Sequence, residues 1–253
     1  ARDEDFIEYV HQANMHSTMM FFTEQGRLYW IKVYDIPEGN RQSKGRALQN
    51  MINIQKGDKV CAFIHVKNLN DQEYVDNHYL IFATKDGLMK KTTLESYSRP
   101  RANGIIALGL REGDRLIRVT LTDGKSQMLV ASYNGKVVRF PEDTVRPMGR
   151  TATGVRAIKL DEDGKDRVVG MICVEEGSKD TVLVISDKGY GKRTLLDDET
   201  GEPIYRITNR GGKGVKTMNL TDKTGNLIGM EAVNDDQDLM LITKSGTAIR
   251  MDM

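Results

Sequence analysis

The chain has 253 residues, of which 39% are hydrophobic and 29% charged, and its formal net charge is +1. This composition suits one large β-rich domain or two ordinary ones, and no run of 18 apolar residues predicts a membrane-spanning helix. A net charge near zero neither favours nor excludes an anionic partner, so the distribution of charge has to decide.

The N-terminal stretch "ARDEDFIEYV" lacks the apolar segment of a signal peptide. The two cysteines, Cys61 and Cys173, are too few for a disulfide framework, and each lies in an apolar run. We therefore expect small buried thiols in a reducing compartment.

Five segments along the chain each predict a β-hairpin. Each has an apolar run, a short polar turn that ends in glycine, and a second strand that carries cations. The glycine provides the positive φ that such turns need. The segments span residues 19–33, 80–94, 128–142, 182–196 and 239–253, with turn glycines Gly26, Gly87, Gly135, Gly189 and Gly246.

A second pattern recurs between the hairpins. It begins with arginine, continues through a basic loop to a glycine, and is followed by an amphipathic strand, an acidic turn and another apolar strand. The four copies span residues 41–54, 99–110, 146–160 and 206–220. Residues 6–14 resemble the last strand of this unit, so the N-terminal segment fits the end of a repeat.

Repeated units of four strands predict an all-β, propeller-like array of antiparallel blades in a single domain spanning residues 1–253. Helix should be scarce, because no period of 3.6 residues persists. The continuous apolar runs of the hairpins need burial on both faces, so we expect them in the centres of their blades. Whether the array closes into a ring or forms an open spiral is left open by the sequence.

Charge is segregated within each unit, with cations in the loops and hairpin exits and acids in the turns. Equivalent positions of a repeat fall on equivalent places of the array, so the loops predict one cationic belt and the acidic turns another surface. The belt would hold Arg41, Lys44, Arg46, Arg99, Arg101, Arg146, Arg150, Arg156, Arg206, Arg210, Lys213 and Lys216, with Lys90, Lys91, Arg139, Lys192 and Arg193 from the hairpin exits.

Such a belt suits phosphate groups. Arginine offers a planar donor fork and lysine a point charge, and consecutive glycine amides, as at Gly211 and Gly212 before Gly214, form anion-binding concavities. The loops lack paired Asn or Gln and exposed aromatic residues, so the surface should hold a duplex by its backbone without reading sequence. The alternative is that these segments are ordinary solvated turns.

No catalytic constellation is evident in the sequence. The glycine-rich loops lack the phosphate-loop spacing and a following helix, and the four histidines have no metal-ligand spacing. Neither cysteine has a catalytic base within its motif. We therefore expect no catalytic residue, metal site or cofactor in this chain.

Four stretches together resemble the C-terminal domain of the DNA gyrase A protein family across essentially the whole chain. They are "RDEDFIEYV" with "LYWIKVYDIPEGNRQSKGRA", "SRPRANGIIALGLREGD", "VRPMGRTATGVRAIKL" and "YRITNRGGKGVKTMNL". The resemblance implies a β-pinwheel, a propeller-like ring of about six blades that wraps double-stranded DNA around its rim. In the holoenzyme this wrap would support ATP-driven negative supercoiling.

The same resemblance implies the partners and the cellular setting. ATP and magnesium would belong to the rest of an A2B2 holoenzyme made with the gyrase B protein, and the active-site tyrosine would belong to the N-terminal part of the gyrase A protein. The resemblance also implies a bacterial cytoplasmic protein associated with the nucleoid, no membrane partner, and a monomeric isolated fragment.

The family's defining loop, the gyrase A box, reads QRRGGKG. The nearest match here is "TNRGGKG", residues 208–214, in which Arg210, Gly211, Gly212, Lys213 and Gly214 match position for position. Thr208 and Asn209 replace the first Gln and Arg, and the full box would be expected ahead of Ala1. Without the full box, the chain could bind DNA without wrapping it tightly.

Two other functions stay open at this point. One is the related C-terminal domain of topoisomerase IV, whose basic loops are more degenerate. The other is a propeller that binds an acidic protein partner. The salt dependence of binding to plain duplex DNA separates DNA binding from the second of these.

Overall fold

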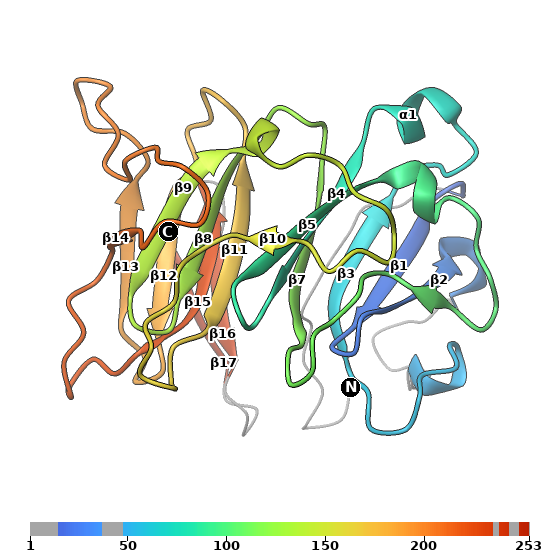
Figure 1. The fold of residues 1–253 in the computed structure, drawn as a ribbon, viewed down its shortest axis with the longest axis horizontal. Helices are drawn as coiled ribbons and strands as arrows, with labels where there is room; N and C mark the ends of the chain where they lie inside the picture. Colours follow the sequence, from blue (N-terminus) through green and yellow to red (C-terminus); the bar gives the residue numbers. More distant parts are fainter. Residues whose placement is uncertain (1–14, 37–47, 235–237, 243–247, 253) are drawn as a thin grey trace.

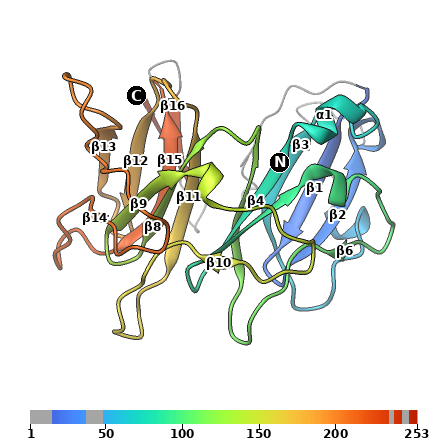
Figure 2. The ribbon, with the colours of Figure 1, turned by 45° about the horizontal axis from the view of Figure 1, so that its top comes forward.

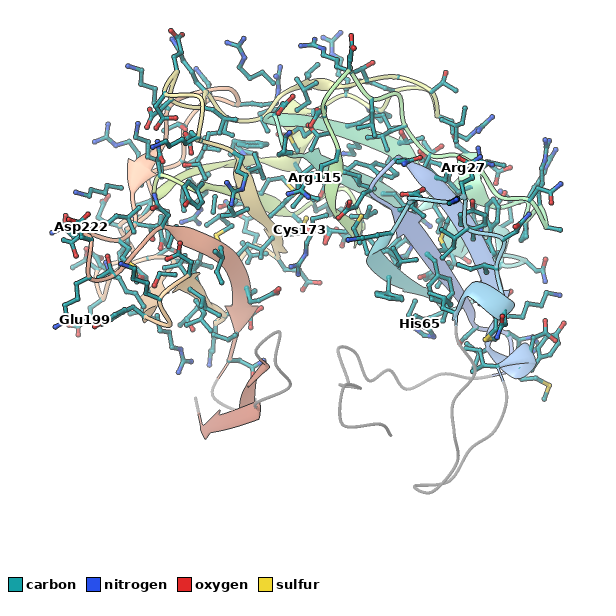
Figure 3. The ribbon with its side chains drawn as sticks, turned by 90° about the horizontal axis from the view of Figure 1, so that it is seen from below. Arg27, His65, Arg115, Cys173, Glu199 and Asp222 are labelled. Carbon is teal, nitrogen blue, oxygen red and sulfur yellow. The ribbon has the colours of Figure 1, made fainter. Side chains whose placement is uncertain are left out.

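The computed structural model describes residues 15–36, 48–234, 238–242 and 248–252. In them, five antiparallel sheets follow one another along an arc (Figures 1 and 2). Seen from below, the described sheets form an open arc (Figure 3). We call each sheet a blade and number the blades in chain order.

Each of blades 1 to 3 has four strands. Blade 1 has the spatial order β3 (Val60–Val66), β1 (Thr18–Thr23), β2 (Arg27–Lys32) and β6 (Ile105–Ile106). Blade 2 has the order β7 (Leu116–Thr122), β4 (Tyr79–Thr84), β5 (Leu88–Thr93) and β10 (Val155–Arg156). Blade 3 has the order β11 (Val168–Val174), β8 (Gln127–Ser132), β9 (Lys136–Pro141) and β14 (Val215–Lys216).

The last two blades have fewer strands among the described residues. Blade 4 has the order β15 (Leu227–Val233), β12 (Thr181–Ser186) and β13 (Gly191–Leu195), and blade 5 pairs β16 (Asp238–Ile242) with β17 (Ala248–Asp252). Helical segments in the described residues are short: α1 (Gln72–Asp76), and the 3-10 turns η1 (Val33–Asp35), η2 (Leu48–Asn50), η3 (Leu94–Tyr97) and η4 (Glu142–Thr144). The prediction of an all-β array with little helix is confirmed, and the described residues contain no helix long and apolar enough to cross a membrane.

The predicted hairpins are present. β1–β2, β4–β5, β8–β9, β12–β13 and β16–β17 are antiparallel pairs. Gly26, Gly87, Gly135 and Gly189 have φ between 82° and 91°, a region that disfavours other residues; Gly246 lies outside the described residues. The hairpin strands are central in blades 1 to 3, as expected, whereas β13 is at an edge of blade 4.

Apolar side chains between successive blades form the core. Phe22 of blade 1 and Phe82 of blade 2 meet edge to face, with ring centroids 5.5 Å apart, and Tyr97 packs on Phe82. Every residue of β1 is buried, and so are five of the six residues of β4. Burial on both faces is why these strands read as continuous apolar runs rather than as an alternating pattern.

The strand that follows each basic loop joins the preceding blade. β6 pairs with β2, β10 with β5 and β14 with β9, so these segments cross from one blade to the one before it. We call them the first strap (residues 99–110), the second strap (146–160) and the third strap (206–220). The sequence suggested that the four strands of each unit belong to the same blade. The structure corrects this prediction, because the short strand of each unit joins the preceding blade. The apolar residues after it pack between blades, as Ala107 and Leu108 do in the core between blades 1 and 2.

Candidate nucleic-acid interface

Each strap is held against the preceding blade by a glycine. Gly104, Gly154 and Gly214 have φ values of 68°, 102° and 76°. A Cβ atom on Gly154 would lie 2.2 Å from the carbonyl oxygen of Met89. A Cβ atom on Gly104 or Gly214 would likewise lie 2.6 or 2.5 Å from a carbonyl oxygen of the neighbouring strand. These glycines therefore serve both a left-handed turn and a close approach of two backbones.

The straps leave the blade edge and return to it. In the second strap, Pro147 bridges to Lys91 and Val155 pairs with Met89, so residues 148–154 form a loop anchored at both ends on β5. Ile207 and Val215 do the same against β9 in the third strap. The basic loops are thus presented from fixed strand edges.

Most of the predicted strap cations are exposed. The predicted strap cations that are exposed are Arg99, Arg101, Arg146, Arg156, Arg206, Lys213 and Lys216. Arg156 and Lys216 occupy the same position, the second residue of the short strand, in consecutive straps. Arg41, Lys44 and Arg46 of the predicted belt lie outside the described residues.

Arg150 and Arg210 are only partly exposed, because each reaches back to the neighbouring strap. Nη1 of Arg150 donates to the carbonyl oxygen of Ile106 at 2.7 Å, and Nη1 of Arg210 donates to that of Arg156 at 2.6 Å. Nε of Arg210 is buried and has no partner among the described residues.

The amide of Gly211 is also used internally. It donates to the carbonyl oxygen of Ala157 at 2.8 Å, and the carbonyl oxygen of Gly212 accepts from the amide of Lys159 at 2.8 Å. The expectation that the amide of Gly211 is available to an anion is therefore wrong in this structure.

Three cations predicted for the belt are buried: Lys90, Lys91 and Arg139 are 0%, 5% and 5% exposed. The prediction that they contact an outside phosphate is wrong in this structure, because straps and neighbouring blades cover β5 and β9. Lys192 and Arg193, on the edge strand β13 of blade 4, are exposed. Both therefore remain candidates for contact with phosphate.

Lys90 connects three parts of the chain. Its Nζ lies 2.5 Å from the carbonyl oxygens of Ala107 in the first strap and Arg150 in the second, and 3.1 Å from Oη of Tyr97. Nζ also lies 4.8 Å from the ring centroid of Phe82. Burial lowers the pKa of Lys90 to about 7, with the nearby charge of Arg150 acting in the same direction.

The other two buried cations have acidic partners. Lys91 Nζ lies 3.2 Å from Glu142 Oε1, and this fully buried carboxylate also accepts from Thr122 Oγ1 and from the amide of Ser126. Arg139 Nη1 lies 3.0 Å from Asp197 Oδ1 in the next blade and also donates to main-chain carbonyl groups there. Both pairs join blades. Breaking the buried pair of Lys91 and Glu142 should be costly, whereas the Asp197 side chain is 46% exposed.

A hollow of about 460 Å³ lies between the second and third straps. Arg111, Arg156 and Arg210 line it, together with Asp86, Gly154 and Gly211. Sequence reasoning missed Arg111, because it lies in a predicted acidic turn and its equivalents in the next repeats are not basic. Acidic and basic turns are therefore less cleanly separated than predicted.

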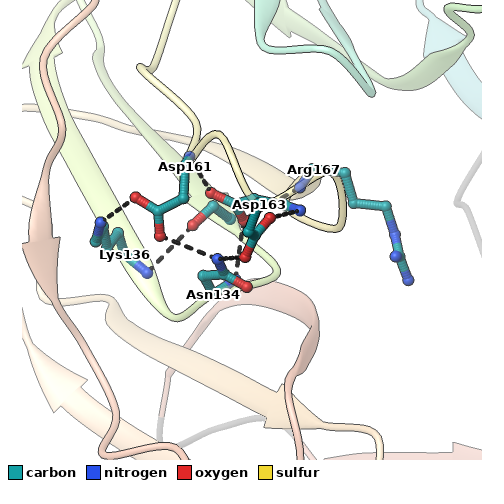
Figure 4. Close-up of polar contacts among 7 residues, drawn as sticks. Asn134, Lys136, Asp161, Asp163 and Arg167 are labelled. Carbon is teal, nitrogen blue, oxygen red and sulfur yellow. Dashed lines mark hydrogen bonds and ion pairs between the residues drawn. The ribbon is translucent and has the colours of Figure 1, made fainter.

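The acidic turns brace the hairpins of their own blades. Oδ1 of Asp58, Asp114 and Asp166 accepts from the residue before each hairpin glycine, at 3.0–3.1 Å. In blade 3 (Figure 4), Lys136 Nζ lies 2.5 Å from Asp161 Oδ1, and the side-chain Nδ2 of Asn134 donates to Asp161 and Asp163. The hydrogen bond from Lys136 is the main reason why the pKa of Asp161 is lowered. The hydrogen bond from Asn134 is the main reason why the pKa of Asp163 is lowered to about 2.

The described residues contain no cluster of His, Cys, Asp and Glu arranged to hold a metal ion. Burial raises the pKa of Cys61 to about 12 and that of Cys173 well above its ordinary value, so both thiols are protonated and poor nucleophiles at neutral pH. The arrangement fits the binding of an extended polyanion along the straps.

Comparison with known proteins supports this interpretation. A family model described as "DNA gyrase C-terminal domain, beta-propeller" matches five consecutive segments, residues 17–67, 78–123, 127–175, 180–234 and 237–253, each containing one hairpin. The DNA gyrase A protein of Staphylococcus aureus (strain NCTC 8325 / PS 47) is 41% identical over 251 residues, covering 99% of this chain and 27% of that protein. The chain thus spans less than a third of the length of the curated relatives it matches.

Two solved structures have similar folds. The C-terminal domain of DNA topoisomerase IV aligns with a TM-score of 0.81 and 21% identity, covering 99% of this chain and 76% of that one. A DNA gyrase A C-terminal domain aligns with a TM-score of 0.73 and 24% identity, covering 94% and 73%. At these identities the likeness concerns the fold alone.

Proposed function

The chain belongs to the DNA gyrase A C-terminal domain family, and from this premise we propose that it binds duplex DNA by its phosphate backbone and bends it along the straps. One observation carries the proposal. Three successive straps, each anchored by a glycine on the preceding blade, carry exposed cations, and the blades that bear the straps follow one arc (Figure 3). Repetition on a curved scaffold is what a continuous polyanion needs.

Binding of this kind is independent of base sequence. The exposed cations of the straps are arginine and lysine, which neutralise phosphate, and phosphate contacts carry no sequence information. Bending 20–30 base pairs by 40–90° costs about 1–6 kcal/mol, so several straps must act together to curve the duplex. Arg156 and Lys216, at the same position in consecutive straps, are the leading phosphate ligands.

At the level of the whole protein, the proposal follows the family. The chain would act within a gyrase A protein that assembles with the gyrase B protein as A2B2 in the bacterial cytoplasm, on the nucleoid. Wrapped DNA would be presented for ATP- and magnesium-dependent strand passage, which would introduce negative supercoils. The catalytic chemistry would belong to other parts of that assembly.

The test is the salt dependence of binding to plain duplex DNA. Each neutralised phosphate contributes about −0.9 to the slope of log K against log salt, so four basic loops with one or two contacts each predict a slope between roughly −4 and −7. Scrambled duplexes should bind equally well. A slope near zero, or a strong preference for one sequence, would refute the proposal.

A second candidate, left open by the sequence, is the corresponding domain of topoisomerase IV, which has a similar fold. A reconstituted gyrase in which this chain replaces the native C-terminal domain distinguishes the two. Net negative supercoiling of relaxed plasmid supports the gyrase role, whereas relaxation alone supports the topoisomerase IV role. A holoenzyme that keeps its own C-terminal domain is the positive control.

A further inference from the structure

Arg150 and Arg210 differ from the other strap cations in the direction of their guanidinium groups. Both belong to loops that were expected to contact phosphate, and Arg210 stands at the arginine of the box-like motif. Yet each uses Nη1 to reach the main chain of the strap before its own, at 2.7 and 2.6 Å. A charged donor makes a stronger hydrogen bond than a neutral one.

The same contact occurs at two successive junctions. Ile106 and Arg156, whose carbonyl groups accept these bonds, are both the second residue of a short strap strand. A main-chain hydrogen bond accompanies each arginine: the amide of Gly109 donates to Ala152 O at 3.0 Å, and the amide of Lys159 donates to Gly212 O at 2.8 Å. The first strap is thereby joined to the second, and the second to the third.

The environment of the arginines fits this bridging contact. Nε of Arg210 is shielded from solvent, and the side chain of Arg150 is only partly exposed. Lys213, in the same loop as Arg210, is exposed. A phosphate running along the rim would therefore meet Lys213 and Arg156 before it met the bonded face of Arg210.

We propose that Arg150 and Arg210 are positioning residues that tie successive straps together and fix the spacing of the exposed cations, rather than direct phosphate ligands. This inference rests on the proposed DNA binding. If it is correct, losing a tie leaves the number of phosphate contacts unchanged but lets neighbouring loops move relative to one another. DNA curvature then depends on the arginine more than affinity does.

The experiment compares Arg210→Ala with Lys213→Ala. For Arg210→Ala we expect an unchanged salt slope, a loss of affinity of less than about threefold, and reduced energy transfer between dyes at the ends of a roughly 40-base-pair duplex, shorter than the persistence length. For Lys213→Ala we expect the magnitude of the slope to fall by about 0.9.

A measurement without DNA separates this inference from the proposed function. In Arg210→Ala, hydrogen exchange at the amides of Lys159 and Gly211 should become faster, and in Arg150→Ala the amide of Gly109 should respond in the same way. The proposal that these arginines join the straps would be overturned by unchanged exchange rates. It would also be overturned if the magnitude of the salt slope fell in Arg210→Ala as it does in Lys213→Ala. A wild-type slope near zero would instead refute DNA binding, and the exchange rates would still decide the tie.

Discussion

Replacing Lys90 by methionine tests how the interior of the arc is held together. Methionine has nearly the same length and apolar character as the lysine stem, but it removes the Nζ group that joins Tyr97 to both the first and the second strap. Because Lys90 is 0% exposed, water cannot take the place of the lost donor without rearrangement. The effect therefore falls on the junction of blades 1 and 2.

The size of the effect follows from the partners. Oη of Tyr97 also donates to the carbonyl oxygen of Ala107, at 2.6 Å, so that carbonyl keeps a donor. The carbonyl of Arg150 loses its contact with Nζ, and an unsatisfied buried carbonyl costs about 1–3 kcal/mol. At pH 8.5 a lysine with a pKa of about 7 is mostly neutral in the folded protein, so the other lost hydrogen bonds are neutral ones, worth about 1 kcal/mol each. The variant also avoids the cost of deprotonating the lysine on folding, so we expect a net destabilisation of about 1–2 kcal/mol at pH 8.5.

The cost should depend on pH in a defined direction. Burial lowers the pKa of Lys90 from 10.5 to about 7, so between pH 7 and 10.5 the unfolded chain binds a proton that the folded chain does not. The unfolding free energy of the wild type then rises with pH through this window. From pH 7.0 to 8.5 the gain from this group is about 1.5 kcal/mol, and Lys90→Met lacks it.

The assay is urea unfolding followed by fluorescence of Trp30, the single tryptophan. Its indole N–H donates to the carbonyl oxygen of Tyr97 at 3.0 Å, so it reports on the affected junction. Lys192→Met is the matched control, because this exposed lysine of blade 4 donates to Thr217 O at 2.8 Å, and we expect it to cost less than about 1 kcal/mol. Equal costs for the two variants, or a cost for Lys90→Met that does not grow with pH, would refute the reasoning.

Two further predictions concern the straps and the inner side of the arc. Gly154→Ala should destabilise the protein by about 3 kcal/mol or more, because its Cβ would collide with Met89 O at positive φ. The control is Gly149→Ala in the same strap, where the space is open, and it should change the unfolding free energy by less than about 0.5 kcal/mol. Urea unfolding of both variants tests this prediction. Arg118 of blade 2 forms a bidentate pair with Glu231 of blade 4, at 2.5 and 2.8 Å. Because both side chains are partly exposed, either single charge reversal should destabilise the protein by about 1 kcal/mol. The double exchange Arg118→Glu with Glu231→Arg should restore stability and DNA curvature. A double-mutant cycle that shows no coupling energy would contradict an interaction between these two residues.

The hairpins could be predicted because their signals are local. A polar turn that ends in glycine, as at Gly87, requires a positive φ whatever surrounds it, and a continuous apolar run such as β4 requires cover on both faces. The strap cations could be predicted as well, because a loop of arginine, lysine and glycine has no apolar surface to bury. Of these, seven are exposed in the structure: Arg99, Arg101, Arg146, Arg156, Arg206, Lys213 and Lys216.

Strand partners could not be predicted in the same way. A two-residue strand such as Val155–Arg156 carries almost no register information, so its pairing with β5 of the preceding blade depends on the approach of Gly154 to Met89 and on the apolar residues that follow. The hydrogen bond from Arg210 to the second strap could not be predicted from the sequence either, because its acceptor lies 54 residues earlier in the chain.

Lys90 and Lys192 show that similar local sequences can give side chains with different burial. Each stands three residues after a hairpin glycine, on a strand that carries a second cation, and the sequence alone gives both the same environment. Only the tertiary structure separates them, because the straps cover β5 and turn Lys90 into a buried junction, whereas Lys192 lies on the exposed edge strand of blade 4. The sequence determines where the chain turns and which strands must be covered, since both are set by neighbouring residues. What covers them depends on contacts between distant segments, and this decides which cations remain available to DNA.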